Sequence, residues 1–541
     1  MSLISPEFLL FAVALVAVYY AVPRRWQWAL LLVASLGFYA LSDLRHIAFI
    51  LITAATTYAS ARAIQYFADT QKAYLKEHKE ELSKEDKTAY KATMKAKRKA
   101  VLVACLLLNF GLLCAFKYVH FAIEQLNAIL GAFGGTPITD TFSLLIPLGI
   151  SFYTFQTMGY LIDVYWGKSQ AERNFLHVVL FTSFFPQVTQ GPISAWEDLA
   201  GELFREHAPS YHNYSWGAQR MIWGFFKKMV VANILAVYVA DVFANYGSYS
   251  GLTVLIGAFC YSAQIYADFS GYMDIVCGLC QILDIRLTEN FERPYFAKSI
   301  AEYWRRWHMS LCSWFKTYIY YPMAMARWNQ NLGRWGRKHL GEHVGKAWGN
   351  YLPATVALVV VWFVTGLWHG ANWAYIAWGG VNGLFIIFSL WMEPTYEKWK
   401  KTLHVREESW AWRAFQTLRT FTLVTFIKVL PEVGTLRQGL GLWRAIFANK
   451  FLPASLTLAG LFPFTGAMVN LPPTEAFLMA LLGVVAMFVV SMLQRKKPLR
   501  AYLDAWPLAA RVALMALLAL IVLSFGVRAS CGAVGFLYAQ F

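Results

Sequence analysis

The chain has 541 residues, of which 58% are hydrophobic and only 15% are charged, and its formal net charge is +17. Soluble domains carry about 25% charged residues, so the composition excludes a cytosolic enzyme, a secreted disulfide-stapled module and a disordered scaffold. The apolar residues gather in runs of about 17–25 residues, the length at which a helix spans about 30 Å of hydrocarbon. The sequence therefore predicts a multi-span membrane protein, whose excess Lys and Arg lie in cytoplasmic loops beside lipid headgroups rather than on nucleic acid.

The N-terminal part begins with three apolar runs, at residues 8–22, 26–41 and 47–67. No small-residue cleavage site precedes a polar mature region, so the first run indicates a retained span rather than a signal peptide. Arg24 and Arg25 follow that run, and residues 68–100 carry ten Lys or Arg against six Asp or Glu. The positive-inside rule places both basic segments in the cytoplasm and the N-terminus outside. We expect residues 68–100 to form a long charged helix, an excursion from a single membrane domain that covers residues 1–541.

Further apolar runs follow, some of them broken by Pro and Gly. They lie near residues 101–119, 142–165, 174–190, 216–245, 251–283, 352–369, 372–392, 410–430, 451–470, 475–493 and 508–527. Phe184-Phe185-Pro186 and Gln190-Gly191-Pro192 interrupt one of them. Irregular backbone at membrane depth is tolerated only where it is buried in protein or lines a cavity, so we expect a cavity beside residues 184–196. The absence of an internal repeat weakens an inverted-repeat transporter interpretation.

Residues 299–321 (SIAEYWRRWHMSLCSWFKTYIYY) combine aromatic and cationic side chains. The segment is too charged to span the bilayer and too aromatic to be a plain loop. We expect an interfacial or re-entrant helix, with rings at headgroup depth and cations reaching water. Such a surface would also suit a phosphorylated acyl carrier, although an ordinary anchoring helix remains the alternative.

One titratable residue, His369, lies between apolar stretches in VVVWFVTGLWHGANWAYIAWGG. Ionisable groups at membrane depth are costly and are therefore functional candidates. A buried neutral imidazole can accept a proton from an attacking hydroxyl near pH 7, and Trp368, Asn372 and Trp373 would shape and orient it. The alternative is a core histidine whose ring is satisfied by a backbone carbonyl.

Carboxylates mark two further places in the apolar sequence. Asp268 and Asp274 are six residues apart, which puts them on different faces of a helix. Each is expected to organise structure by accepting hydrogen bonds from the backbone or from cationic partners, and an arginine after residue 285 is a candidate partner for one of the two. Asp163 is expected to be an organising carboxylate as well. The seven cysteines are odd in number and scattered, so neither a disulfide framework nor a bound metal is expected. No P-loop, GxSxG or HExxH motif is present.

Taken together, an ordered series of motifs resembles the membrane-bound O-acyltransferase (MBOAT) family, in its bacterial polysaccharide O-acetylase, alginate O-acetylase-like branch. The motifs are 147–156 (PLGISFYTFQ), 160–165 (YLIDVY), 184–187 (FFPQ) with Gly191-Pro192, 268–274 (DFSGYMD), 289–295 (ENFERPY), 304–310 (WRRWHMS) and 366–372 (GLWHGAN). The resemblance implies an all-α polytopic bundle, with re-entrant or interfacial helices around a central funnel or tunnel.

The resemblance also implies roles for particular residues. His369 corresponds to the family's catalytic histidine, and His308 to the second histidine of this branch. The substrate-binding candidates are Trp304, Arg305, Arg306, Trp307, Lys316, Trp368, Asn372, Asp268, Tyr272, Gln187 and Tyr538. Tyr538 lies in an ending, FLYAQF, that resembles the Phe-x-Tyr-x-x-Phe ending of the branch, and it is expected to help pass the acyl group across. Residues 322–329 depart from the usual Gly-Gly-Asn-Arg stretch, which puts the donor-facing loop in doubt.

The resemblance therefore implies an O-acyltransferase of the inner (cytoplasmic) membrane. It would move an acyl group, expected to be acetyl, from a cytoplasmic acetyl-CoA or acyl-carrier thioester to a hydroxyl of an extracytoplasmic glycan. Transfer would be direct or would pass through an extracytoplasmic esterase-like partner protein, and no cofactor would stay bound. The alternatives are D-alanyl transfer to teichoic acid, a transporter or flippase with His369 in its path, and an inactive scaffold.

Overall fold

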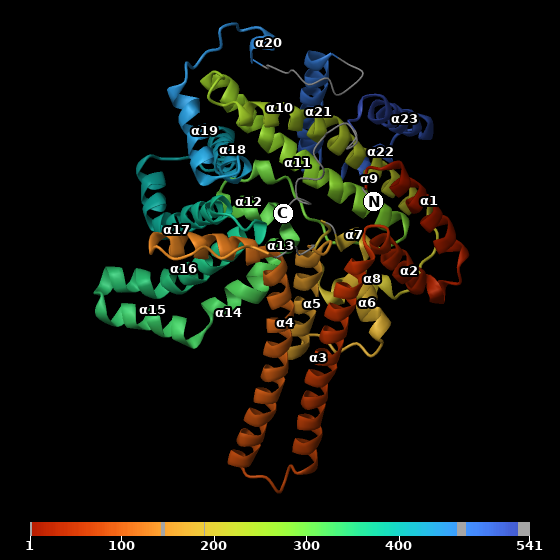
Figure 1. Cartoon of the computed structure of the whole chain (residues 1–541), viewed down its shortest axis with the longest axis vertical. Coiled ribbons are helices and arrows are strands. Elements are labelled where there is room, and N and C mark those ends of the chain that lie inside the picture. Colours follow the sequence, from red (N-terminus) through yellow and green to blue (C-terminus); the bar gives the residue numbers. More distant parts are fainter. Residues whose placement is uncertain (1–2, 142–145, 189, 462–471, 528–541) are drawn as a thin grey trace. The chain divides into compact units, whose positions relative to one another are not determined.

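The computed structural model describes residues 3–141, 146–188, 190–461 and 472–527 (Figure 1). Across these residues the structure is helical, and the one β-type contact is an isolated antiparallel bridge between Phe291 and Trp307. Eight of the described helices are long and apolar enough to cross a membrane. They are Leu44–Glu77, Lys84–Ala132, Tyr211–Ala244, Gly251–Ile282, Glu342–His369, Trp373–Thr402, Thr474–Leu493 and Leu508–Phe525. The prediction of an all-α multi-pass membrane protein is confirmed.

The helices divide into two compact units. The first unit contains residues 7–213 and 280–288, and the second contains residues 2–6, 214–279 and 289–541. The single domain expected over residues 1–541 stays a prediction.

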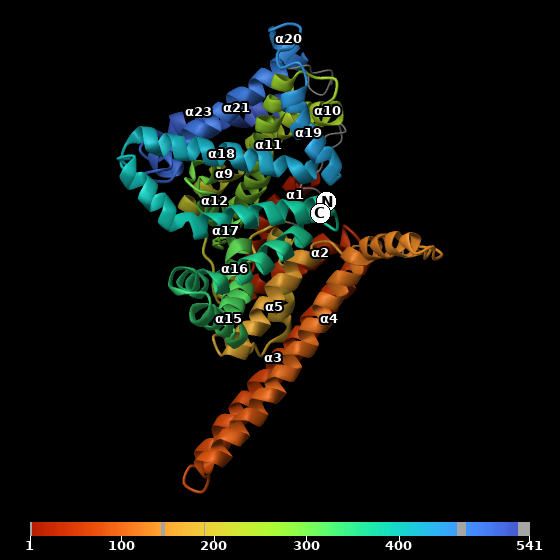
Figure 2. The ribbon, with the colours of Figure 1, turned by 90° about the vertical axis from the view of Figure 1, so that its left-hand side faces the viewer.

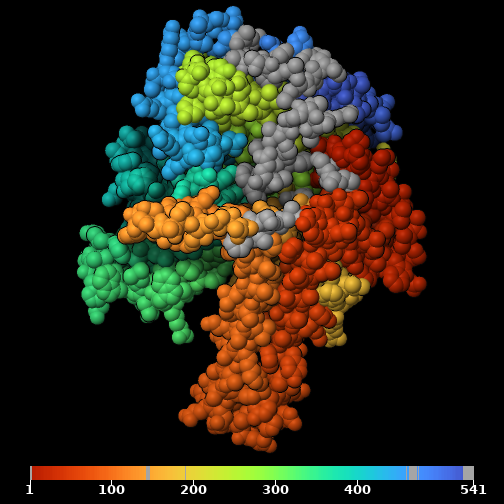
Figure 3. Space-filling view, viewed as in Figure 1, coloured from red at the N-terminus to blue at the C-terminus, as the bar shows by residue number. Residues whose placement is uncertain are grey.

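The first unit begins with α1 (Pro6–Ala21) and α2 (Gln27–Ala40), followed by a long hairpin of α3 (Leu44–Glu77) and α4 (Lys84–Ala132). Figures 2 and 3 show the two hairpin helices side by side, with their distal halves standing clear of the other helices of the unit. The one long helix expected over residues 68–100 was wrong, because the chain turns at residues 78–83. Ser83 caps the returning helix by accepting a hydrogen bond from the Asp86 amide at 3.1 Å.

The rest of the first unit is short and well buried. It contains α5 (Ile150–Trp166), α6 (Phe175–Ser183), α7 (Phe185–Val188) and α8 (Trp196–Leu203). Almost every described residue of segment 184–196 is buried. A surface hollow of about 490 Å³ includes Trp196 in its lining, and the cavity expected along the remainder of that segment stays a prediction.

The second unit begins with one long helix, in which α9 (Tyr211–Phe225) and α10 (Asn233–Ala244) are joined by a π-helical segment, Phe226–Ala232. A second long helix, α11 (Gly251–Ile282), follows. The aromatic segment predicted to be interfacial or re-entrant forms two short helices, α12 (Ile300–Arg306) and α13 (Met309–Phe315). A second π-helical segment, Lys316–Tyr320, leads into α14 (Tyr321–Ala324). Each short helix formed by residues 299–321 is therefore too short to span a bilayer.

The C-terminal half of the second unit is a series of helices, most of them longer than α12 and α13 (Figures 1 and 2). They are α15 (Arg327–His339), α16 (Glu342–His369), α17 (Trp373–Thr402), α18 (Trp410–Glu432), α19 (Leu436–Ala448), α20 (Leu458–Leu461), α21 (Pro473–Leu493), α22 (Leu499–Leu503) and α23 (Leu508–Phe525). The apolar runs did not reveal α15 and α19, because both helices are amphipathic. The run expected at 451–470 is helical only in α20 over its described residues, 451–461.

Candidate active site

His369 is the last residue of α16, and the turn that follows sends the chain back along α17. The two helices pack closely because glycines face the contact: a Cβ on Gly366 would lie 2.6 Å from the Tyr375 carbonyl oxygen. Asn372 begins α17 by accepting a hydrogen bond from the Ala374 amide at 2.8 Å, and its amide group donates to the Gly434 carbonyl at 2.8 Å. Asn372 therefore fixes the turn beside His369, as a helix cap.

The buried His369 ring lies among aromatic rings. The ring centres of Trp368 and Trp378 are 4.7 and 4.8 Å from it, and that of Tyr375 is 6.4 Å away. His369 also faces a small cavity of about 30 Å³. The lining of this cavity, called the His369 cavity below, consists of Tyr261, Ile265, Trp304, Trp307, His369, Tyr375, Trp378, Lys428 and Pro431. The cavity has room for about two groups the size of a water molecule, and its walls are mainly aromatic.

His308 lies between α12 and α13 in the left-handed conformation, with φ +48°. This conformation is strained for a residue with a Cβ. Asn290 holds the turn, since its carbonyl and side-chain oxygens accept hydrogen bonds from the Met309 and Ser310 amides at 3.1 and 3.0 Å. Burial lowers the pKa of His308 to about 3, which favours a neutral imidazole at physiological pH.

A tryptophan lies between the two predicted catalytic histidines. The Trp368 ring centre is 6.1 Å from the ring of His308 and 4.7 Å from that of His369. Trp304 and Trp307, two of the predicted substrate-binding residues, line the His369 cavity. The structure thus brings both histidines and three of the predicted tryptophans into one aromatic region of the second unit.

The predicted cationic residues of segment 299–321 lie elsewhere. Arg305 and Lys316 are exposed, and Arg305 lines a separate hollow of about 920 Å³. Arg306 forms an ion pair with Glu302 at 2.6 Å. None of the three cations belongs to the lining of the His369 cavity.

The carboxylates of α11 have partners that sequence reasoning did not find. The buried Asp268 forms an ion pair with Lys228, while Asp274 lies 2.9 Å from Arg220 and 2.6 Å from Lys227. The expectation of cationic partners is therefore confirmed, but these partners precede α11, and the suggested arginine after residue 285 was wrong.

The remaining predicted binding residues do not reach the cavity in the described structure. Tyr272 is buried in α11 and is absent from the cavity lining. Gln187 belongs to the first unit, where it donates to Ser194 at 2.6 Å and accepts from Gln156 at 3.3 Å. Tyr538 lies outside the described residues. Asp163, expected to organise structure, lies 3.6 Å from Lys168.

Lys428 is the cavity-lining cation that sequence reasoning missed. It lies near the C-terminal end of α18, within the apolar run at 410–430, and its Nζ atom lies 3.7 Å from the Trp307 ring centre. The run also contains Arg413 and Arg419, so Lys428 does not stand alone among apolar residues as His369 does. Tyr261 of α11 also lines the cavity, and its hydroxyl donates a hydrogen bond at 2.7 Å to Glu432, which lies in α18 with Lys428.

A larger basic cavity of about 670 Å³ lies in the same unit. Its charged lining residues are five cations, Arg220, Lys227, Arg293, Arg495 and Arg500, and three carboxylates, Asp274, Glu289 and Glu292. Arg220 and Lys227 are paired with Asp274 and Glu289, so Arg293, Arg495 and Arg500 give the cavity its basic character. Tyr266 also lines it, and the Tyr266 ring centre lies 6.1 Å from that of Trp307 in the His369 cavity. Two aromatic side chains thus connect the lining of the basic cavity to that of the His369 cavity.

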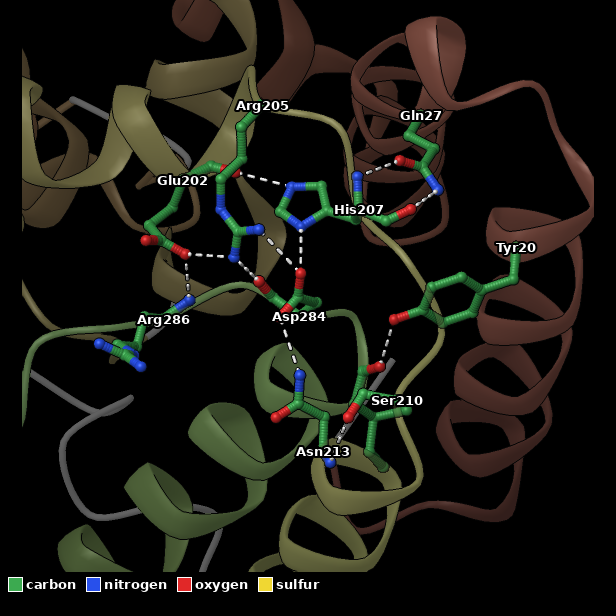
Figure 4. A network of polar contacts seen from close by, with 10 residues as sticks. Tyr20, Gln27, Glu202, Arg205, His207, Ser210, Asn213, Asp284 and Arg286 are labelled. Atoms are coloured by element: carbon green, nitrogen blue, oxygen red, sulfur yellow. Dashed lines mark hydrogen bonds and ion pairs between the residues drawn. The ribbon is translucent and has the colours of Figure 1, made fainter.

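A separate polar cluster lies in the first unit (Figure 4). Asp284 accepts hydrogen bonds from Arg205 and Asn213, each at 2.8 Å, and lies 3.2 Å from the buried His207 ring. The other ring nitrogen of His207 lies 2.8 Å from the Glu202 carbonyl oxygen. Burial opposes ionisation of Asp284, but hydrogen bonds from Arg205 and His207 hold its pKa below the usual value. The cluster links residues 202–207 to Asn213, near the start of α9, and to Asp284, which follows α11.

Fold and site define an integral membrane protein in which a buried histidine faces a small aromatic cavity. Comparison with known proteins gives the family: the MBOAT, membrane-bound O-acyltransferase family, model matches residues 170–327. This match supports the family resemblance of the motifs that lie within it. The matched region includes α6 to α14 and His308.

Named relatives agree with the family. The chain is 36% identical over 271 residues to "Probable alginate O-acetylase AlgI" of Azotobacter vinelandii, covering 50% of each chain. It is 31% identical over 313 residues to "Peptidoglycan O-acetyltransferase" of Helicobacter pylori, covering 52% of this chain and 54% of the relative. It is 27% identical over 301 residues to "Teichoic acid D-alanyltransferase" of Streptococcus thermophilus, covering 53% and 66%. The chain thus spans about half the length of the first two relatives.

Proposed function

We propose that the protein is an O-acyltransferase that moves an acetyl group from a cytoplasmic thioester to a hydroxyl of a cell-envelope or exported polysaccharide. The observation that carries the proposal is the buried histidine of the GLWHGAN motif facing an aromatic cavity. The relatives named as O-acetylases support the acetyl group and the glycan acceptor. Transfer is direct, or it passes through an extracytoplasmic esterase-like partner.

In this proposal His369 acts as the general base. Its imidazole takes the proton of the acceptor hydroxyl while the oxygen attacks the thioester carbonyl carbon. The C–S bond then breaks, and the leaving thiolate takes the proton back from the imidazolium. The small volume of the cavity suits an acetyl group better than a long acyl chain. His308, next to Trp368, belongs to the same aromatic region and is proposed to help orient the reacting groups.

The basic cavity is the proposed entrance for the donor. Acetyl-CoA and acyl-carrier thioesters both carry anionic phosphates. The guanidinium groups of Arg293, Arg495 and Arg500, which line the cavity, can form ion pairs with such phosphates. Basic residues directly after α21, at 495–497, favour a cytoplasmic location for this side of the second unit. The same rule favours an N-terminus outside the cytoplasmic membrane.

The proposal is tested by measuring base-labile acetyl and D-alanyl esters in the envelopes of cells that make the wild type or His369→Ala at matched expression. We expect the variant to lose acetyl ester by about 10²–10⁴-fold, the contribution of a general base. Loss of D-alanyl ester instead would favour the activity named for the teichoic acid relatives. Unchanged amounts of both esters, with the variant folded and inserted, would contradict the proposal.

A further inference from the structure

We propose that Lys428 stabilises the negative charge that develops on the thioester carbonyl oxygen during acyl transfer. This inference rests on the proposed function and adds a second reacting group to the His369 cavity. Lys428 is 5% exposed, and it lines that cavity together with His369. Lys428 comes from α18 and His369 from the end of α16, so two separate helices place a proton acceptor and an N–H donor around one small space.

The Lys428 amine lies in an aromatic cage. Its Nζ atom is 3.7 Å from the ring centre of Trp307, 4.8 Å from that of Tyr295 and 5.2 Å from that of Tyr303. It also donates a hydrogen bond to the Tyr295 hydroxyl at 2.8 Å. Electron-rich ring faces attract an ammonium group, so the cage holds the amine at a fixed position. One hydrogen bond leaves further N–H groups of the same amine for a ligand in the cavity.

The other buried lysines of this unit have a different environment. Lys228 forms an ion pair with Asp268, and Lys227 lies 2.6 Å from Asp274. Within the described part of the chain, no carboxylate oxygen lies within 4.0 Å of the Lys428 amine. A buried cation without an anion is costly. An anionic reaction intermediate in the cavity would supply the charge that the aspartates supply to the other two lysines.

The chemistry of acyl transfer produces such an anion beside the histidine. When the hydroxyl oxygen attacks, a C–O bond forms, the hydroxyl proton goes to His369, and the carbonyl π electrons move onto the carbonyl oxygen. A Lys428 N–H then donates to this oxyanion, an interaction that is strong in water-excluded surroundings. Both protonation states of an amine carry N–H donors, so this hydrogen bond requires no proton transfer to or from Lys428. When the C–S bond breaks, the carbonyl re-forms, and the thiolate takes the proton from His369.

The experiment uses membrane vesicles that carry the full-length chain, with the envelope polysaccharide fraction of the producing cells as acceptor and acetyl-CoA and fluoroacetyl-CoA as donors. Thiol release is measured for the wild type, Lys428→Met, Lys428→Arg and a control, Lys401→Met, in which the replaced lysine is exposed. The rate in His369→Ala vesicles is subtracted as background. Fluorine withdraws electrons and stabilises an oxyanion without help from the protein, so the two donors report directly on charge at the carbonyl oxygen.

We expect Lys428→Met to slow acetyl transfer by about 10²–10³-fold, as for the loss of an oxyanion donor, and Lys401→Met to leave it unchanged. The rate ratio of fluoroacetyl to acetyl transfer should rise in Lys428→Met and stay near the wild-type value in Lys428→Arg. This ratio is measured within one preparation, so it does not depend on how much of a variant is folded. An unchanged ratio in Lys428→Met would overturn the role of Lys428 alone. Absence of thiol release above background in the wild type would overturn the proposed function and this role with it.

Discussion

The polar cluster around Asp284 and the His369 cavity each bury a histidine, but they surround it differently. In the cluster, both ring nitrogens of His207 face oxygen atoms, at 3.2 and 2.8 Å. In the cavity, three aromatic rings flank His369, and the ring faces an open space shared with Lys428. Burial alone therefore does not mark a reactive histidine. A histidine enclosed by protein acceptors holds segments together, whereas one at a cavity can meet a substrate.

The same contrast applies to the buried lysines of the second unit. Lys228 is enclosed by its ion pair with Asp268, and the two side chains are 1% and 3% exposed. Lys428 instead lies against aromatic rings at the cavity. Both lysines are buried in the same unit, so they differ mainly in whether the amine is ion-paired or lines the cavity. Substitutions of enclosed groups should cost stability, and substitutions at the cavity should cost activity.

Among the enclosed groups, Lys228→Met should cost the most stability. Removing one partner leaves the Asp268 carboxylate buried without its cation, which costs about 3–5 kcal/mol. The free energy of unfolding in mixed detergent micelles measures this cost. The double variant with Asp268→Asn should recover part of it, because no buried charge is then left alone. Additive losses in the double variant would show that the two side chains do not interact.

A smaller loss is expected for Asp284→Asn in the first unit. Asp284 has φ +62°, a conformation that asparagine tolerates, so this change removes the charge without adding backbone strain. Loss of the hydrogen bonds between charged groups should lower the unfolding free energy by about 1.5–3 kcal/mol, as measured by the same titration. Asp198→Asn, at an exposed position of the same unit, serves as the control. Equal stability of Asp284→Asn and the wild type would show that the cluster does not stabilise the fold.

The smallest expected effect is the change with pH in the stability that the Asp284 cluster contributes. The pKa of Asp284 is lower in the folded protein, because hydrogen bonds from Arg205 and His207 outweigh burial. The unfolded chain therefore binds the proton first as the pH falls, and the stabilisation is lost below about pH 3.9, the ordinary pKa of Asp. The stability difference between the wild type and Asp284→Asn should be constant at neutral pH and should shrink at acidic pH. A difference that grows on acidification would contradict the assigned sign.

The sequence was informative where one residue departs from its surroundings. His369 stands out in an apolar run, and the structure places it at the cavity. The helices also agree with the runs where a span is continuous, as in α11, α17 and α21. Lys428 shares the run at 410–430 with Arg413 and Arg419, so it does not depart from its surroundings as His369 does, and the pattern alone did not single it out.

Other features depend on which helices become neighbours. Hydrophobic periodicity places Asp268 and Asp274 on different faces of α11, but it does not identify the helix opposite each face. Their partners come from the chain around a π-helical segment, Phe226–Ala232, which the pattern did not predict. The turn at residues 78–83 was missed because Glu and Lys favour helix on both sides of it.

Acyl transfer at the cavity is tested most sharply by substituting the two buried histidines in the same way. His369→Gln and His207→Gln are expressed at matched levels, and acetyl ester per inserted molecule is measured together with the free energy of unfolding. We predict that His369→Gln loses the ester while its stability stays near that of the wild type. His207→Gln should lose stability and keep the ester made per folded molecule. Retention of the ester by a folded His369→Gln protein would contradict the claim that the cavity is the site of acyl transfer.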